Sequence, residues 1–366
     1  MTKDFQRAGG NPFGASPSPS VSEVDAALYG TVDVPVSGRI VSKPIEIMSI
    51  RADVRQPRRA VPPVVRLHWD GKANLVPELL AQWQEVAEKR AGIRIDVVSL
   101  LNGKESLPEI DQAPAVAQEF IALCRLAQSI HKDGLINPVS VIERSQDYLI
   151  ETGERRWLAY HLLFLYLGDR YKAVPARISD GRDYIWRQAQ ENTARRQLNA
   201  ISMARQLALL IMDARRDVDG VKYDEFETLI LNGECDRRYY AQVHNGTIHR
   251  IPRGMGERIE AAMALSRNRI AQYRQLLRLT EDEAVNDALW TKADVEDWSD
   301  KAIREIATTI PIEVLREIVK DEEWTLESLR EKVDMLNRFN ISQQKAVGIP
   351  ANPYRVPDVP RVVEKP

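Results

Sequence analysis

The chain has 366 residues, of which 44% are hydrophobic and 28% are charged, and its formal net charge is −2. This length predicts two or three globular domains, and no apolar run approaches the roughly 20 residues that span a bilayer. The two cysteines, Cys124 and Cys235, fit neither a metal-ligand spacing nor a disulfide framework, so they predict buried thiols in a reducing cytoplasm.

Composition and periodicity predict four segments. Residues 1–42 are rich in Gly, Pro and Ser, which predicts a disordered arm. Residues 43–190 mix strand-like and helix-like runs and predict an α+β domain. Residues 191–340 contain helix-like runs and no convincing strand, which predicts an all-α domain. Residues 341–366 hold five prolines and predict an extended, proline-rich tail.

The α+β segment contains short β-branched runs and two helix-spaced runs. The first helix-spaced run ends at Gly134, where we expect a left-handed C-cap. The expected elements are strands at 44–50, 137–142 and 147–153, and helices at 114–134 and 154–168.

A glycine and two arginines stand at the junction between the strand at 147–153 and the helix after it. Gly153 lets the backbone approach a ligand closely, and a helix start favours an anion. Arg155 and Arg156 add fork-shaped donors that suit phosphate oxygens. The motif predicts a phosphate-binding turn, and the alternative is an exposed helical turn with solvated arginines.

A second motif, "QENTARRQLNAISMA" at 190–204, places Glu191 and Asn192 just before a predicted helix. A carboxylate beside an amide oxygen is a plausible ligand pair for Mg²⁺, which prefers oxygen donors. Arg195 would reach another phosphate. The alternative is that Asn192 simply caps the helix.

Charge is strongly segregated in the all-α segment. Residues 237–279 contain nine arginines and two acids, a local charge of +7, whereas residues 280–334 contain seven bases and seventeen acids, a local charge of −10. The asymmetry indicates a nucleic-acid surface beside a solvated acidic segment. The alternative is two oppositely charged helical faces that pack together.

The run at 254–279 predicts two helices joined by a short turn, with Ser266 as the N-cap of the second helix. Ile270, Leu276 and Leu277 would face the core. In a helix-turn-helix the start of the second helix reads base edges. The side chains expected to project toward DNA are Arg267, Asn268, Arg269, Gln272 and Tyr273, and those expected to contact phosphates are Arg250 and Arg253.

Together, these motifs resemble one family. The order is "VRQPRR" (54–59), "LAQSIHKDGLINPVSVI" (126–142), the Gly153 motif, the Glu191 motif and "SRNRIAQYRQLLRL" (266–279). This order is similar to that of the ParB partition proteins, in which a ParB/sulfiredoxin-like N-terminal domain precedes a helix-turn-helix domain. The resemblance covers about residues 44–310. Sulfiredoxin has a cysteine where this chain has Glu154, so we expect no thiol-redox role.

The resemblance implies a protein that binds CTP with Mg²⁺, closes on double-stranded DNA as a clamp, and uses slow CTP hydrolysis as a switch. It implies a homodimer, a ParA-type ATPase as partner, and a cytoplasmic location on a nucleoid or plasmid, away from membranes. Glu191 and Asn192 would govern Mg²⁺ and hydrolysis. Carried over by motif, the phosphate-binding residues would be Gly153, Glu154, Arg155, Arg156 and Arg195, and the pocket would be bordered by Gln56, Arg58, Gly134 and Pro138.

Three features depart from the family pattern. About 55 extra residues follow the "QPR" box, an insert at about 60–115. The region at 232–255 is long and arginine-rich, and no C-terminal dimerisation domain is recognisable after residue 340. Two alternative functions of the same fold also stay open: a transcriptional regulator with a vestigial nucleotide site, and a ParB-like nuclease.

Overall fold

The computed structural model describes residues 42–66, 69–104, 113–194, 198–321, 323–347 and 353–358. The chain divides into two units, Met1–Val41 and Ser42–Pro366. The predicted arm at 1–42 lies outside the described residues except for its last position. None of the helices in the described part is long and apolar enough to cross a membrane.

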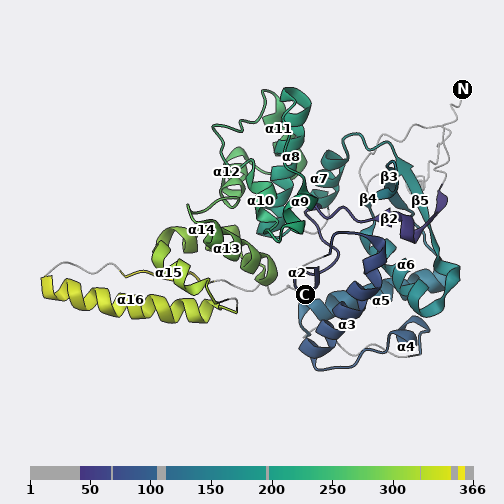
Figure 1. Cartoon of the computed structure of the whole chain (residues 1–366), viewed down its shortest axis with the longest axis horizontal. Helices are drawn as coiled ribbons and strands as arrows, with labels where there is room; N and C mark the ends of the chain where they lie inside the picture. Colours follow the sequence, from purple (N-terminus) through teal and green to yellow (C-terminus); the bar gives the residue numbers. More distant parts are fainter. Residues whose placement is uncertain are drawn as a thin grey trace, which may run out of the picture. The chain divides into compact units, whose positions relative to one another are not determined.

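A five-stranded sheet forms the centre of the first half of the second unit (Figure 1). Its strands run in the order β1-β5-β3-β4-β2, and the β3–β5 and β4–β2 pairs are parallel while the other pairs are antiparallel. The mixed sheet confirms the predicted α+β domain. The strands are β1 (Lys43–Glu46), β2 (Ile50–Arg51), β3 (Val139–Glu143), β4 (Tyr148–Thr152) and β5 (Ala173–Ser179).

Two strand predictions need correction. The run at 44–50 is not one strand, because the 3-10 turn η1 (Ile47–Ser49) separates β1 from β2. Strand β5, which contains Pro175, was not predicted from the sequence. Proline cannot donate to a strand ladder, so it lowers the strand signal of its run. Pro175 nevertheless pairs with Pro44 of β1 in register.

The predicted insert at 60–115 folds as part of this domain. Its helix α3 packs on α5 and α6, and Trp83 of α3 donates from Nε1 to the carbonyl of Val116 at 3.0 Å. The Trp83 and Phe120 rings lie 5.7 Å apart. The insert therefore shares the hydrophobic core of the sheet domain. The helical elements here are α2 (Pro63–Arg66), η2 (Ala73–Leu75), α3 (Val76–Ala91), α4 (Val97–Leu101), α5 (Ala115–Asp133), α6 (Glu154–Leu167) and η3 (Asp169–Tyr171).

Gly134 follows α5 as expected, but its backbone differs from the predicted left-handed cap. Its φ is +83°, and its ψ of 175° lies far from the left-handed helical basin. This conformation is essentially restricted to glycine. It turns the chain out of the helix and into the loop that leads to β3.

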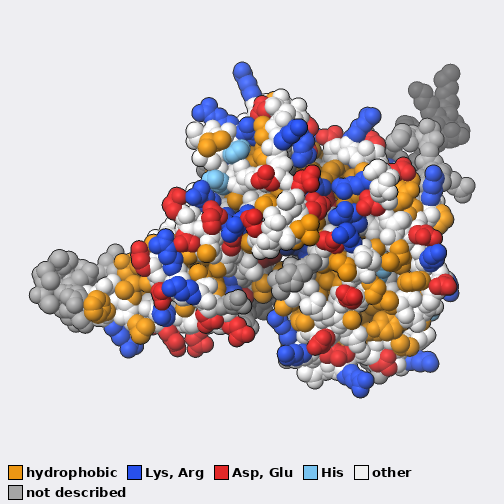
Figure 2. Space-filling view, in the orientation of Figure 1, with side chains coloured by type: hydrophobic (Ala, Val, Ile, Leu, Met, Phe, Trp, Pro, Cys, Tyr) orange, Lys and Arg blue, Asp and Glu red, His pale blue; other side chains and the backbone are white. Residues whose placement is uncertain are grey.

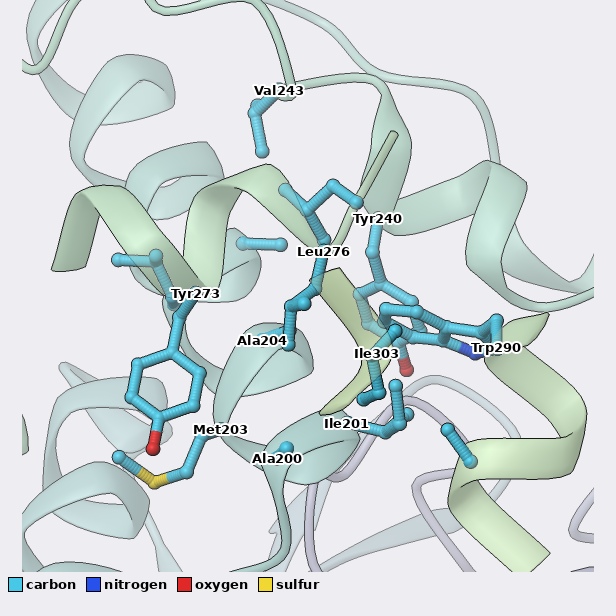
Figure 3. Packing of buried hydrophobic residues seen from close by; sticks show 14 of the residues in the cluster. Ala200, Ile201, Met203, Ala204, Tyr240, Val243, Tyr273, Leu276, Trp290 and Ile303 are labelled. Atoms are coloured by element: carbon cyan, nitrogen blue, oxygen red, sulfur yellow. The ribbon is translucent and has the colours of Figure 1, made fainter. Parts of the chain in front are cut away.

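The rest of the chain is helical, and within its described residues from 191 onward no strand occurs. The long helix α8 is buried on nearly all sides, as expected for the central helix of a bundle. Figure 3 shows Tyr240, Tyr273, Leu276 and Trp290 from other elements around it. The helices are α7 (Tyr184–Ala194), α8 (Ala200–Asp219), α9 (Phe226–Leu231), α10 (Arg237–Ala241), α11 (Met255–Met263), α12 (Arg267–Gln275), α13 (Glu283–Glu296), α14 (Asp300–Thr309), α15 (Ile312–Ile318) and α16 (Leu326–Val347).

The predicted tail at 341–366 begins too early, because α16 continues to Val347. Residues 353–358 have no regular structure and run back along α16. There the side chain of Asn337 accepts a hydrogen bond from the backbone N–H of Tyr354 at 2.9 Å and donates one to its carbonyl at 2.7 Å. These paired bonds hold that part of the tail against the helix.

Candidate functional site

Gly153 occupies the N-cap of α6 with φ +98° and ψ 25°, in the left-handed region. A Cβ at this position would lie 2.9 Å from a terminal nitrogen of Arg156. Glycine is therefore favoured by the backbone conformation, while the Arg156 guanidinium would have to shift to make room for a Cβ. The first N–H groups of a helix have no partner within that helix, and the helix dipole favours an anion beside them. The turn has the geometry of an anion site.

Replacing Gly153 with alanine should destabilise the chain by roughly 1–2 kcal/mol, because a side chain is strained at this φ. The matched control is Gly256→Ala, at a glycine in the first turn of α11 that has no positive φ and no atom within 4 Å of its added Cβ. Alanine there should be neutral or stabilising. Urea denaturation of both variants measures the difference, and equal losses of stability would contradict the strain argument.

Arg156 joins this turn to the loop that follows Gly134. One terminal nitrogen of its guanidinium donates to the carbonyls of Asn137 and Pro138, each at 2.7 Å. The structure thus brings together three predicted site residues from two separate motifs: Gly153, Arg156 and Pro138. Arg155 points to solvent, so its guanidinium is the more accessible of the two.

Glu154 turns inward instead of toward the exposed turn. It is 7% exposed, and one carboxylate oxygen accepts from the backbone N–H of Ala60 at 3.4 Å. The other oxygen has no hydrogen-bond donor among the described residues. Burial raises the pKa of Glu154, while the nearby guanidinium of Arg66 opposes that shift. Because the Glu154 carboxylate is buried, a ligand at the turn would contact only the backbone of this residue.

The loop after β2 lies against the end of β4, next to the same turn. Gln56 donates from its side-chain amide to the carbonyls of Ile150 and Glu151, each at 3.2 Å. Arg58 is exposed. Gln56 of the predicted "QPR" box is therefore close to the strand that leads into Gly153.

Glu191 and Asn192 were predicted to stand just before a helix, but the structure places them inside one. They lie in the last turn of α7, and the cap of the following helix is Asn199, which accepts from Ser202 N–H at 2.7 Å. Asn192 instead donates to the side-chain oxygen of Gln206 at 3.0 Å. Arg195 lies outside the described residues.

Helix α7 is fastened to β4 beside the turn. Gln188 donates to the carbonyl of Glu151 at 2.8 Å, and Arg187 donates to the Glu151 carboxylate, also at 2.8 Å. These bonds place α7 next to the strand that ends just before Gly153. Within the described residues, no group of three His, Cys, Asp or Glu side chains is placed to hold a metal.

A buried ionic network that sequence reasoning missed joins the "QPR" loop to the helical bundle. Arg205 of α8 donates to both oxygens of Asp294, at 3.0 and 2.8 Å, and also to Asp236. Arg59 donates to the same Asp236 carboxylate, and Trp290 donates to it from Nε1 at 2.9 Å. No sequence signal reveals these pairings, because their members lie far apart along the chain.

Asp236 is ionised by its surroundings. Burial alone would raise the pKa of this carboxyl, but the guanidinium groups of Arg205 and Arg59 outweigh burial and hold the pKa below its usual range. The network therefore contains fixed opposite charges away from water. Such groups require one another, since removal of one partner leaves the other uncompensated.

Helices α11 and α12 form the predicted pair with a short turn between them. Ala264 takes φ +49° in that turn, and Ser266 holds the N-cap position of α12 without a side-chain capping bond. The predicted core residues are buried, at 5% exposure for Ile270, 1% for Leu276 and 0% for Leu277. Arg267 and Asn268 are exposed at the start of α12, as expected.

Tyr273 does not project outward, in contrast to the sequence prediction, whereas the Arg269 side chain is 39% exposed but is engaged with protein groups. Tyr273 is 7% exposed and points toward Met203 of α8 (Figure 3). Arg269 donates to both oxygens of Asp300, at 2.9 and 3.0 Å, and its guanidinium lies over the Tyr273 ring. Gln272 is partly buried and accepts from Arg269 at 2.7 Å. These three residues brace α12 against its neighbours.

The acidic segment neutralises much of the basic one, as the alternative of packed charged faces predicted. The ion pairs across the two segments are Arg237 with Glu283 and Asp287, Arg238 with Asp287, Arg269 with Asp300, and Arg278 with Glu281. Figure 2 shows the result: acidic and basic side chains are interspersed over this face of the helical part. The formal +7 of residues 237–279 therefore overstates the free positive charge.

Three arginines of the basic segment stay exposed and have no ion pair among the described residues: Arg250, Arg253 and Arg267. Arg250 and Arg253 precede α11, and Arg267 begins α12. Arg258 pairs with Asp183 at 2.8 Å, and Arg274 donates to the backbone carbonyls of Val243 and His249. The free positive charge of this segment is thus concentrated around α11 and the start of α12.

Residues 109–183 match the family described as the ParB N-terminal domain. This match spans part of the insert, α5, the Gly153 turn and β5. One solved structure that aligns is the C-terminally truncated chromosome-partitioning protein ParB from Caulobacter crescentus complexed to the centromeric parS site. The identity is 17%, the alignment covers 81% of this chain and 100% of that chain, and the TM-score is 0.30. No curated protein matches this chain.

Proposed function

We propose that this chain, whose residues 109–183 match the ParB N-terminal domain family, is a DNA-binding partition protein whose binding is switched by CTP and Mg²⁺. The observation that carries the DNA-binding part is the placement of Arg250, Arg253 and Arg267. They keep their charge exposed while the other arginines of the basic segment are engaged with protein groups.

Two kinds of DNA contact follow from these positions. Arg267 and Asn268 stand at the exposed start of α12, the part of a recognition helix that meets base edges. An arginine suits guanine and an asparagine suits adenine. Arg250 and Arg253 lie in the loop before α11, where they are suited to phosphates, which give affinity without sequence information.

The residues of the Gly153 turn fit a nucleotide phosphate chain. The left-handed glycine and the helix start offer backbone N–H groups, and Arg155 offers an exposed guanidinium. Arg156 is bonded to the carbonyls of Asn137 and Pro138, so its role is to hold the loop at 134–138, which would border the base. A bound CTP would supply the charge that orders the turn.

Magnesium would bind through the nucleotide phosphates and the end of α7. Mg²⁺ commonly uses one or two protein oxygens together with phosphates and waters. Glu191 offers a carboxylate, and Asn192 offers its side-chain oxygen, since its amide nitrogen already donates to Gln206. CTP would be hydrolysed at this site, and the Glu191 carboxylate would act as the general base.

The nucleotide part is tested by titrating the full chain with each of the four NTPs, with Mg²⁺ and with EDTA. We expect CTP to bind most tightly, and Arg156→Ala to weaken CTP binding about tenfold, which is about 1.4 kcal/mol. The matched control is Arg90→Ala, at an exposed arginine of α3. Equal binding of all four NTPs, or an unchanged CTP affinity in Arg156→Ala, would contradict the proposed site.

A further inference from the structure

The loop that joins α10 to α11 carries two of the exposed arginines. It spans residues 242–254, within the long, arginine-rich region of the sequence, and no Asp or Glu occurs between Arg237 and Gly256. Arg250 and Arg253 lie in the second half of the loop and are exposed. A loop of this length holds one conformation only where its backbone groups have partners.

Arg274, in the last turn of α12, binds the first half of this loop. Its Nε donates to the carbonyl of Val243 at 2.9 Å, and one terminal nitrogen donates to the carbonyls of Asn245 at 3.3 Å and His249 at 2.5 Å. Burial and the neighbouring Arg215 guanidinium lower the pKa of Arg274, and no carboxylate among the described residues opposes that shift. The planar guanidinium therefore serves to bind three carbonyls of one loop.

Further hydrogen bonds fix the same stretch of backbone. Arg215 of α8 donates to the carbonyl of Ile248 at 2.8 Å. The side-chain oxygen of Asn245 accepts from the backbone N–H groups of Thr247 at 2.9 Å and Ile248 at 3.2 Å. The N–H of His249 donates to the carbonyl of Asn245 at 2.8 Å. The backbone is therefore held by two helices and by its own turn, up to the residue before the first exposed arginine of the loop.

We propose that Arg274 is a positioning residue for duplex binding, an inference that rests on the DNA binding proposed above. Arg274 and Arg267 belong to the same helix. By holding the loop, Arg274 keeps Arg250 and Arg253 in a fixed position relative to the start of α12. The phosphate contacts and the base contacts are then made together, in one register.

The energetic reason is preorganisation. A loop that must be ordered when the duplex binds loses part of the binding free energy to that ordering, whereas a loop already held in place does not. The bonds of Arg274 are made within the chain, so they order the loop before DNA arrives. Arg274 acts through the loop arginines, and its own guanidinium is occupied by carbonyls.

The first arm of the test measures amide hydrogen exchange in the full chain without DNA. The N–H groups of Thr247, Ile248 and His249 are bonded within the loop, so their exchange reports on its conformation. Arg274→Ala should raise their exchange rates by about tenfold or more, and Gln275→Ala, at the exposed next residue of α12, should not. Peptides from α8 report global stability. Wild-type exchange of the loop in Arg274→Ala would overturn the inference.

The second arm measures duplex affinity over a salt series. Arg274→Ala should weaken duplex binding by about tenfold and reduce the slope of log K against log salt by about 1 to 2, because two phosphate contacts depend on the loop. Arg274→Lys should behave in the same way, since a lysine keeps the charge but cannot span three carbonyls with its single nitrogen. Wild-type affinity and slope in Arg274→Lys would show that charge alone matters, against the inference.

A double-mutant cycle separates positioning from direct contact. In a chain that already carries Arg250→Ala and Arg253→Ala, Arg274→Ala should weaken duplex binding by no more than about twofold, and an undiminished tenfold loss would overturn the inference. If Arg274→Ala also raises exchange in α8, Asn245→Ala makes the same test from the loop side, because it removes the acceptor of two loop N–H groups. A wild-type chain that binds no duplex would refute the proposed function itself, whereas wild-type binding with no change in these variants refutes only the role of Arg274.

Discussion

Arg267→Ala should weaken binding to the cognate duplex by about 1–3 kcal/mol, the range for one good bidentate contact with a base. Binding to random duplex should change far less, because Arg267 stands at the exposed start of α12, where base edges are read. The measurement is a salt series on cognate and scrambled duplexes for each variant. The same proportional loss on both duplexes would mean that α12 does not read bases.

Arg250→Ala is the matched contrast, since Arg250 is also an exposed arginine without an ion pair among the described residues. It lies in the loop before α11, so we expect a phosphate contact. Its loss should weaken cognate and scrambled binding alike and reduce the salt slope by about 1. Arg269→Ala should behave differently from both, because it removes the bidentate pair with Asp300 and acts through the position of α12.

Asp236→Ala should lower the free energy of unfolding by about 3–5 kcal/mol, the range for breaking a buried ion pair. The change would leave the buried Arg205 with fewer partners, Arg59 without its closest carboxylate, and the Trp290 N–H without an acceptor. Urea denaturation measures the loss. Asp236→Asn, which keeps an acceptor oxygen but not the charge, should fall between Asp236→Ala and the wild type.

The control for this prediction is Glu331→Ala, at an exposed acid of α16. Surface changes of this kind usually alter stability by no more than about 0.5 kcal/mol. If Asp236→Ala destabilised the chain no more than Glu331→Ala, the network would not hold the "QPR" loop to the bundle.

The parts of the fold that were predictable depend on local signals. The helix at 154–168 and the glycine before it carry their information in adjacent residues, and the structure has both at α6 and Gly153. The burial of Tyr273 could also have been predicted from helical spacing. It lies three positions after Ile270 and three before Leu276, on the face that those two core residues define.

Other features depend on contacts between distant positions, so no local pattern could reveal them. The bond between Arg269 and Asp300 engages a predicted base-reading side chain with the protein, and it exists only because α12 and α14 pack together. The position of Glu191 on α7 reflects a helix that the sequence analysis did not recognise. β5 was missed because Pro175 weakens its strand signal, although the sheet tolerates that residue.

The most direct test of the central claim is a selection from a pool of random duplexes, with wild-type chain and Arg267→Ala side by side. The account predicts that the wild type enriches one defined sequence, and that Arg267→Ala loses preference at one or two positions of it while still retaining duplex through Arg250 and Arg253. Enrichment of the same sequence with undiminished preference by Arg267→Ala, or no enrichment by the wild type, would contradict DNA reading by α12.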